Sequence, residues 1–302
     1  MSGGLVSAVD WRETEGQWTC SIVFYDVGYE ELPLIQGSKI SFRVEEGRFC
    51  TGYYSNSMKN NSRIDSWKSL HPCPYNLEIT RGTRCLSCRS NDVMTPCIRC
   101  DGSSCNANYD VQEKCRNSTA YVYLASFKER IKAGVSRDRR VLKRWIEQGT
   151  DAARIVLKGN GLKVRQYEKW IQTELGAANH IQANQKIVPT KQSNMDVSLE
   201  LLEEYAARVY KLIPDAVKMN EVAVDLSPYY RIPEISVRPI ALKVQPGLQV
   251  NGVILGTKGP ILYIEMASQT YALDTHRLLS RRVVFDDARP SNVQSGLGRF
   301  LS

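Results

Sequence analysis

Residues 71–115 read HPCPYNLEITRGTRCLSCRSNDVMTPCIRCDGSSCNANYDVQEKC, and this cysteine-rich stretch decides how the chain is organised. It contains two C-x2-C pairs, Cys85 with Cys88 and Cys97 with Cys100, separated by eight residues. Two thiolates in one tight turn face a common centre, as tetrahedral zinc requires. The spacing predicts that the two pairs close one site.

Further cysteines surround these pairs, so that eight of the nine cysteines lie between positions 50 and 115. Eight thiolates fit two four-cysteine sites, and we expect one or two structural zinc ions. The spacing leaves open how Cys50, Cys73, Cys105 and Cys115 are paired, and His71 is an alternative ligand to one thiolate. The candidate metal ligands are Cys50, Cys73, Cys85, Cys88, Cys97, Cys100, Cys105 and Cys115.

Two other uses of the cysteines are open. A disulfide framework needs an oxidising compartment, but the start, MSGGLVSAVDWRETEG, has neither the basic nor the apolar region of a secretory leader. An iron–sulfur cluster ranks behind zinc because the Cys-x-x-Cys-x-x-Cys run of ferredoxins is missing. No window approaches twenty apolar residues. We therefore expect a cytoplasmic protein with reduced cysteines and no membrane partner.

Basic residues are concentrated in one region of the chain. Between residues 118 and 172 there are thirteen Lys and Arg against five acids, an excess that equals the whole net charge of +8. Such a patch beside metal knuckles indicates a polyanionic partner, RNA or DNA. A solvated basic face is the alternative. The predicted phosphate contacts are Lys132, Arg137, Arg139, Arg140, Lys143 and Arg144.

Alternating apolar and polar residues at both ends of the chain predict antiparallel β structure. The early runs cover residues 17–26 and 39–44. After residue 235, five runs between Gly and Pro turns predict a five-stranded sheet or small barrel, which can pair with the early strands as one β body. The sequence MDVSLELLEEYAARVYKLI at 195–213 predicts an amphipathic helix with an acidic outer face.

The middle of the chain combines strand and helix patterns. TAYVYLASF is a β-branched and aromatic run, and Gly149 follows a basic helical pattern in the position that ends helices. The predicted elements are strands at 119–127 and 130–135, a basic helix at 137–147, a short capped element at 151–158 and a helix at 162–175.

This succession of motifs resembles the degenerate pattern of GIY-YIG nucleases. VYLA at 122–125 is followed by KAGVS at 132–136, by a helix that opens with RDRR at 137–140 and continues to RWIEQG at 144–149, and by Glu168 in a later helix. The resemblance implies a compact β-hairpin and helix unit that cleaves or contacts a phosphodiester chain.

In GIY-YIG enzymes, a single Glu holds one divalent ion, tyrosines orient or activate water, and an arginine neutralises developing charge. A phosphodiester transition state spreads negative charge over its oxygens, so a fixed cation and guanidinium favour it. The resemblance assigns Tyr123 to the first tyrosine, Gly134 to the glycine of the second motif, Arg140 to the helix arginine and Glu168 to the carboxylate that would hold Mg²⁺ or Mn²⁺.

One position departs from the nuclease pattern. Lys132 occupies the position of the second tyrosine of the nuclease pattern. Another group would then have to orient or activate the water, and Tyr121 and Tyr167 are the candidates. Arg139 and Arg144 compete for the arginine role. A lysine at position 132 is consistent with an active nuclease. It is also consistent with a protein that has kept the nuclease fold and only binds nucleic acid.

Over nearly the whole chain, the sequence is also similar to an uncharacterised family, domain of unknown function 2797. The family carries no known activity with it. The motifs that support the similarity are CxG at 50–52, both C-x2-C pairs, CDGxxC at 100–105, VYLASF at 122–127, KAGVS at 132–136, RWIEQGTDAA at 144–153 and GVILGTKGPILY at 252–263.

The sequence thus predicts an α+β protein in which a cysteine-rich zinc unit and a GIY-YIG-like β-hairpin and helix unit lie between N- and C-terminal antiparallel β segments. The predicted units are an N-terminal β segment at 1–70, the zinc unit at 71–117, a basic GIY-YIG-like domain at 118–190, a helix and Pro-rich connector at 191–234 and a C-terminal β domain at 235–302.

Three functions are consistent with this organisation. The first is a zinc-containing nucleic-acid-binding protein that contacts RNA or DNA phosphates. The second is a metal-dependent endonuclease in which Tyr123, Arg140 and Glu168 act on the phosphodiester. The third is an interaction module of a ribonucleoprotein, in which the acidic helix at 198–212 meets a partner protein.

Overall fold

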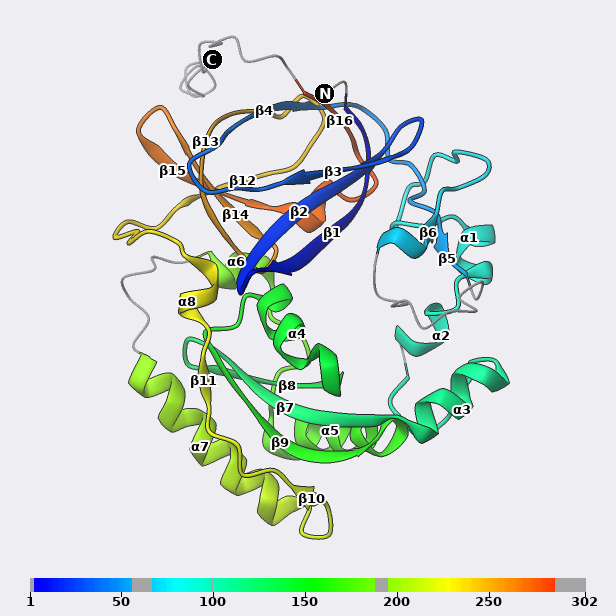
Figure 1. The fold of residues 1–302 in the computed structure, drawn as a ribbon, viewed down its shortest axis with the longest axis vertical. Helices are drawn as coiled ribbons and strands as arrows, with labels where there is room; N and C mark the ends of the chain where they lie inside the picture. The colour runs from blue at the N-terminus through cyan, green and yellow to red at the C-terminus, as the bar shows by residue number, and fades with distance from the viewer. Residues whose placement is uncertain (1–2, 56–66, 99, 188–194, 286–302) are drawn as a thin grey trace, which may run out of the picture.

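Two large β-sheets, a two-stranded ladder and the helices between and behind the large sheets make up the described part of the fold (Figure 1). The computed structural model describes residues 3–55, 67–98, 100–187 and 195–285. Its mixed α+β composition with large antiparallel sheets agrees with the prediction from the sequence.

The larger sheet combines strands from both ends of the chain. Its order is β12-β15-β14-β13-β4-β16-β1-β2-β3, so the predicted pairing of N- and C-terminal strands in one β body is confirmed. All neighbours are antiparallel except β12 and β15. The strands are β1 (Gly4–Thr14), β2 (Gln17–Tyr25), β3 (Tyr29–Pro33), β4 (Lys39–Val44), β12 (Ile240–Leu242), β13 (Gln249–Lys258), β14 (Ile261–Met266), β15 (Gln269–Asp274) and β16 (Arg282–Phe285).

The smaller sheet comes from the middle of the chain, and β7 lies at its centre. Tyr121 and Tyr123 of β7 face the large sheet, whereas Val122 and Leu124 face the opposite side. Because both faces of β7 are buried, its sequence is an unbroken apolar run instead of an alternating one. The strands are β7 (Thr119–Phe127), β8 (Arg130–Arg137), β9 (Ala152–Asn160), β10 (Val217–Lys218) and β11 (Val224–Asp225).

One predicted element of this region is wrong. The sequence predicts a short capped element at 151–158, but all of these residues except Asp151 belong to strand β9, which pairs with β7 along its length. A short apolar run bounded by turns fits either a helix or a strand, and only pairing with a neighbour decides between them.

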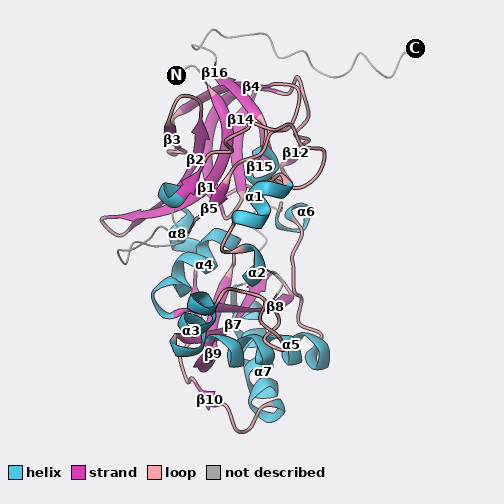
Figure 2. Cartoon of the chain, turned by 90° about the vertical axis from the view of Figure 1, so that its right-hand side faces the viewer, coloured by secondary structure: helices cyan, strands magenta, loops and turns pink. Residues whose placement is uncertain are grey.

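Helices separate and cover the two sheets (Figures 1 and 2). The short helix α4 packs between them, since it contacts β1 and β13 on one side and β8 on the other. Helices α5 and α7 cover the outer face of the smaller sheet. The helices are α1 (Leu86–Asn91), α2 (Thr95–Ile98), α3 (Tyr109–Asn117), α4 (Val141–Gln148), α5 (Gly161–Leu175), α6 (Ala183–Lys186), α7 (Met195–Leu212) and α8 (Ser227–Tyr230).

The ends of these helices follow from their sequence. The side chain of Asn160 accepts hydrogen bonds from the amides of Leu162 and Lys163 and so begins α5. Gly149 ends α4 in the left-handed conformation, with φ of 71°. The predicted basic helix from residue 137 starts later than expected, because a 3-10 turn at Asp138–Arg140 precedes α4.

The cysteine-rich segment lies beside the two sheets and contains α1, α2, α3 and a small two-stranded ladder (Figure 1). That ladder pairs β5 (Tyr53–Tyr54) with β6 (Leu70–His71), which follows a 3-10 turn at Trp67–Ser69. A further 3-10 turn at Thr275–Leu278 follows β15. Among the described residues, no helix is both long enough and apolar enough to cross a bilayer.

Candidate functional site

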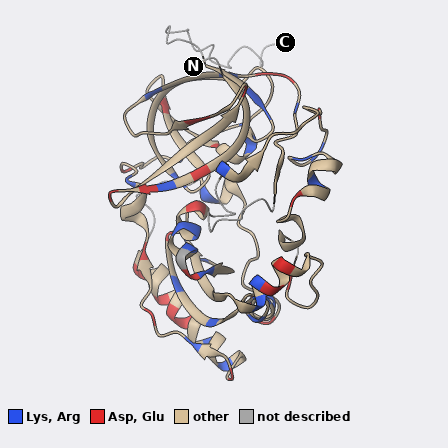
Figure 3. Ribbon diagram, turned by 45° about the vertical axis from the view of Figure 1, so that its right-hand side comes forward, with Lys and Arg blue, Asp and Glu red and all other residues tan. Residues whose placement is uncertain are grey.

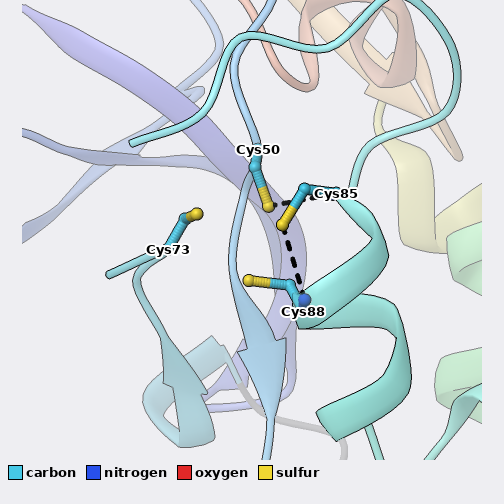
Figure 4. A group of neighbouring side chains, drawn as sticks. All are labelled: Cys50, Cys73, Cys85 and Cys88. Atoms are coloured by element: carbon cyan, nitrogen blue, oxygen red, sulfur yellow. Dashed lines mark hydrogen bonds between the residues drawn. The ribbon is translucent and has the colours of Figure 1, made fainter. Parts of the chain in front are cut away.

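Four cysteines from three separate segments form a candidate metal centre (Figure 4). Cys50 precedes β5, Cys73 follows β6, Cys85 caps α1 and Cys88 lies in its first turn. Their four sulfur atoms all lie within 4.8 Å of one another. All nine cysteines are free thiols, so the structure contains none of the disulfides considered for this region.

The backbone around Cys50 is shaped to hold these thiols. Gly52 has φ of 90°, and a Cβ at this position would overlap the carbonyl oxygen of His71, so the CxG motif requires glycine. Its amide donates to the Sγ of Cys50 at 3.4 Å, and the amide of Cys85 donates to the same sulfur at 3.2 Å. The amide of Cys88 donates to the Sγ of Cys85 at 3.4 Å. Such bonds stabilise thiolates.

The donor set fits a divalent cation with a preference for sulfur. Burial raises the pKa of Cys50 and of Cys88, because a thiolate loses its hydration in this position. Four thiolates in so small a space would repel one another unless a cation neutralised them. Four sulfurs around one point are the typical donor set of a structural zinc site.

His71 takes no part in this group. Its Nε2 lies 2.8 Å from the Oγ of Ser55, and its ring stacks on Tyr53 at a centroid distance of 5.4 Å. The structure therefore favours four sulfur ligands over three sulfurs and one imidazole.

The prediction that the two C-x2-C pairs close one site is wrong. Cys97 and Cys100 lie apart from Cys85 and Cys88, whose partners come from the non-local pairing of β5 with β6. The sequence spacing could not reveal this pairing, because 22 residues separate Cys50 from Cys73 along the chain.

The other four candidate ligands, Cys97, Cys100, Cys105 and Cys115, lie next to α5. Arg165 of α5 donates to the carbonyl oxygen of Cys100 at 2.9 Å, and a Cβ at Gly161 would overlap the Sγ of Cys115. The pKa of Cys97 and that of Cys115 are raised, mainly by burial. Neighbouring thiolates also raise both pKa values, whereas the charge of Arg165 lowers them. Among the described residues, only the first four cysteines form a tight group of sulfurs, so metal binding by Cys97, Cys100, Cys105 and Cys115 stays a prediction.

A cleft of about 840 Å³ lies between the two sheets. Its walls come from β1, β8, α4, α6 and the end of β15, so both sheets contribute to it. Figure 3 shows charges of both signs around α4 and a concentration of acidic residues on α7. The charged residues that line the cleft are Lys132, Arg140, Arg144, Lys186, Arg277, Asp10, Glu147 and Asp274.

Part of the predicted basic patch is neutralised inside this cleft. Glu147 lies 3.2 Å from Arg140 and 3.8 Å from both Lys143 and Arg144, and Lys143 also pairs with Asp10 at 2.6 Å. Among the other predicted contacts, Arg137 is exposed and does not line the cleft, and the side chain of Arg139 lies outside the described part of the chain. The cleft therefore holds fewer available cations than the sequence predicted.

A polar group at the edge of the cleft contains most of the predicted catalytic residues. Tyr123 is 1% exposed, and its hydroxyl accepts a hydrogen bond from Nε2 of Gln148 at 2.6 Å. Burial raises the pKa of Tyr123; the charge of Arg144 opposes this effect and that of Glu168 adds to it. Gly134 faces the tyrosine ring, since a Cβ there would overlap the hydroxyl.

Glu168 interacts with the same cations. Burial raises the pKa of Glu168, whereas the charges of Lys132, Arg165 and Arg144 lower it. Lys132 donates to the carbonyl oxygen of Asn179. Tyr123, Lys132 and Glu168 thus lie within electrostatic range of Arg144, which the sequence left as a competitor for the arginine role. Arg140 instead pairs with Glu147.

Several residues of the cleft could not be found from sequence. Lys186 at the end of α6, His180 before it, and His276 and Arg277 after β15 all line the cleft, yet none belongs to a recognisable motif. They come from segments far apart in the chain, so no local spacing marks them. Only the packing of the large sheet against α4 brings them to one place.

The fold and the site together define a mixed α+β protein with a four-cysteine candidate metal centre and a charged cleft between its two sheets. The family described as "Protein of unknown function (DUF2797)" matches residues 37–280, and the chain belongs to this family. No curated protein matches the chain. No solved structure matches it either.

Proposed function

We propose that this protein binds nucleic acid in the cleft between its two sheets and that zinc stabilises the segment beside it. The observation that carries the proposal is the lining of the cleft, where Lys132, Arg144, Lys186 and Arg277 come from four separate elements. Cations gathered from several elements in a concave site attract a polyanion more strongly than the same charges spread over a surface.

Zinc would have a structural role in this proposal. Cys50, Cys73, Cys85 and Cys88 would hold the ion, which supplies cross-links to a segment with few apolar residues. The amide of Tyr54, a residue that lines the cleft, donates to Asp92 at 2.9 Å, just after α1. The metal centre therefore supports one wall of the cleft.

Salt dependence of binding tests the proposal. Each phosphate contact releases counterions, so the log–log slope of affinity against salt should be about −0.7 to −0.9 per contact. Fluorescence anisotropy with labelled RNA and DNA measures this slope for the wild type and for Arg144→Gln, which we expect to bind more weakly. Arg208→Gln on the distant helix α7 is the matched control. A flat salt response, or equal loss in both variants, would contradict the proposal.

The second candidate function is metal-dependent cleavage of the phosphodiester chain. It is supported by the proximity of Tyr123, Arg144 and Glu168, which match the GIY-YIG pattern if Arg144 takes the arginine role. Glu168 would hold Mg²⁺ or Mn²⁺, which supplies charge stabilisation to the phosphate when bound. Arg144 would neutralise charge on the phosphate, and the Tyr123 hydroxyl, fixed by Gln148, would orient water.

Cleavage is tested by incubating labelled RNA or DNA with Mg²⁺ or Mn²⁺ and pure wild-type protein, Glu168→Gln or Arg140→Gln. We expect Glu168→Gln to abolish cleavage and Arg140→Gln to retain most of it, because Arg140 pairs with Glu147. Equal cleavage by the wild type and Glu168→Gln would indicate a contaminant. No cleavage of any substrate would leave binding alone as the function.

The third alternative, an interaction module of a ribonucleoprotein, receives weaker support. Glu200, Glu203 and Glu204 lie exposed on α7, as that alternative needs. However, Glu203 pairs with Arg154, and Glu204 lies 3.9 Å from Arg208. These pairs reduce the charge that the helix offers to a partner protein.

A further inference from the structure

Two lysines in the cleft have no carboxylate partner among the described residues. Lys132 of β8 donates to the carbonyl oxygen of Asn179, and Lys186 at the end of α6 donates to that of Gln148 at 2.7 Å. Neither ammonium lies within 4.0 Å of an acid in the part of the chain that the structure describes. The other cations of the cleft do pair with acids, so these two lysines are exceptional.

The two lysines also repel each other and Arg144. Burial, together with the charges of Lys132 and Arg144, lowers the pKa of Lys186 to about 8, although the charge of Asp274 opposes these effects. Burial likewise lowers the pKa of Lys132, with Arg144 adding to the effect and Glu168 opposing it. Like charges that share a partly buried site destabilise one another unless an anion is present.

We propose that Lys132, Lys186 and Arg144 form an anion site for one phosphate of a single-stranded nucleic acid, an inference that rests on the proposed function. All three side chains line the cleft, and they come from β8, α6 and α4. A phosphate group has several acceptor oxygens, so it can receive hydrogen bonds from both ammonium groups and the guanidinium at once. The carbonyl oxygens of Asn179 and Gln148 hold the lysines in position for it.

The size and the walls of the cleft indicate a single strand. A pocket of about 840 Å³ matches the sites that enclose one small organic ligand, and it is far too small for a double helix. Tyr54 and Trp67 line the same cleft and are partly exposed. Arg84 lies over the Tyr54 ring and Tyr29 packs against the Trp67 ring, so at most one face of each ring remains to stack on an unpaired base. Aromatic stacking next to a cationic groove is typical of single-strand binding.

Binding measurements with a single strand, its duplex and three lysine variants test this inference. We expect the wild type to bind a labelled oligonucleotide more tightly than the duplex of the same sequence. Lys132→Met and Lys186→Met should each weaken single-strand binding about tenfold and reduce the salt slope by about 0.7. Lys211→Met, an exposed lysine at the end of α7, should bind like the wild type.

Lys186→Arg tests whether Lys186→Met loses affinity because the positive charge is missing or because the fold is damaged. It keeps the positive charge, so it should restore most of the affinity that Lys186→Met loses, and thermal unfolding of each variant monitors the fold. Wild-type affinity in both methionine variants would overturn the anion site while leaving the proposed function in place. Equal binding of strand and duplex would overturn the choice of a single strand.

Pyrophosphate distinguishes the failure of this inference from the failure of the proposed function. If the protein binds no nucleic acid, the proposed function fails. The anion site would still be supported if pyrophosphate raised the Tm of the wild type but not that of Lys186→Met. Absence of both effects would overturn the anion site as well.

Discussion

At the residue scale, Lys186 should make anion binding sensitive to pH. Burial lowers its pKa to about 8, whereas an exposed lysine titrates near pH 10.4. Only the protonated ammonium attracts a phosphate, so affinity should be full below pH 8 and should fall as the pH rises through about 8. The charged and titratable groups that face Lys186 are Lys132, Arg144, Lys258, Asp274, His180 and His276.

Lys186→Met provides the control for this pH dependence. Its affinity should be lower and should vary less between about pH 7 and pH 9, since the ammonium whose pKa is about 8 is absent. For stability, the sign is the opposite of that for binding. The lowered pKa means that the buried charge destabilises the fold below pH 8, and this cost is relieved as the pH rises from 8 toward the ordinary value. Identical pH profiles of the two proteins would contradict the assignment.

At the scale of single elements, Gly134 fixes how β7 and β8 pack. It lies opposite Tyr123 in the ladder, and a Cβ there would overlap the hydroxyl of that fully buried ring. Gly134→Ala should therefore lower the free energy of unfolding by about 2 kcal/mol, because the ring cannot move away. Urea unfolding measures the loss.

Gly159→Ala is the matched control for this change. Gly159 lies in the neighbouring strand β9, and the nearest atom to a Cβ there is 3.4 Å away, an ordinary contact. We expect a change of less than about 0.5 kcal/mol. Equal destabilisation by both substitutions would show that the overlap with the tyrosine ring does not control the position.

The elements also show where sequence patterns suffice. The runs predicted at 17–26, at 39–44 and after residue 235 do form strands, and helix α7 was predicted correctly, because alternation and helical periodicity are local properties. Strands β1 and β3 were not among the predicted runs. Residues 151–158 were misread since β9 is buried on both faces and therefore shows no alternation. The grouping of the metal ligands was wrong for a similar reason. The pairing of β5 with β6 brings Cys50 and Cys73 to α1, and the spacing of cysteines in the sequence does not reveal that pairing.

At the scale of the whole molecule, metal content tests both groups of cysteines. If each group holds one zinc ion, elemental analysis should find about two zinc atoms per chain. Cys88→Ser and Cys100→Ser come from different groups, so each should lower the content by about one. An unchanged content in Cys100→Ser would mean that the group beside α5 is not a metal site.

Metal removal should also affect the cleft. A chelator would release the cross-links between β5, β6 and α1, so the Tm should fall. Since Tyr54 of β5 lines the cleft, single-strand affinity should fall as well, and added zinc should restore both. Unchanged single-strand affinity after complete metal removal would show that the metal centre does not support the cleft.

The two sheets should unfold together, because one apolar core extends from the large sheet to the inner face of the smaller one. A buried ion pair joins them: Lys258 at the end of β13 contacts Asp151, whose other carboxylate oxygen accepts from the amide of Lys128 at 2.6 Å. The side chains of Asp151 and Lys258 are only 7% and 17% exposed. Asp151→Asn would leave the lysine charge buried without its partner, which typically costs about 3 kcal/mol.

A double variant separates the buried charge from the general loss of contacts. Asp151→Asn with Lys258→Met removes both charges, so it should recover part of the stability that Asp151→Asn loses. All three proteins should still unfold in a single transition by calorimetry, because the shared core remains. Two separate transitions in the wild type would show instead that the sheets are independent, and the walls of the cleft would then have no fixed relative position.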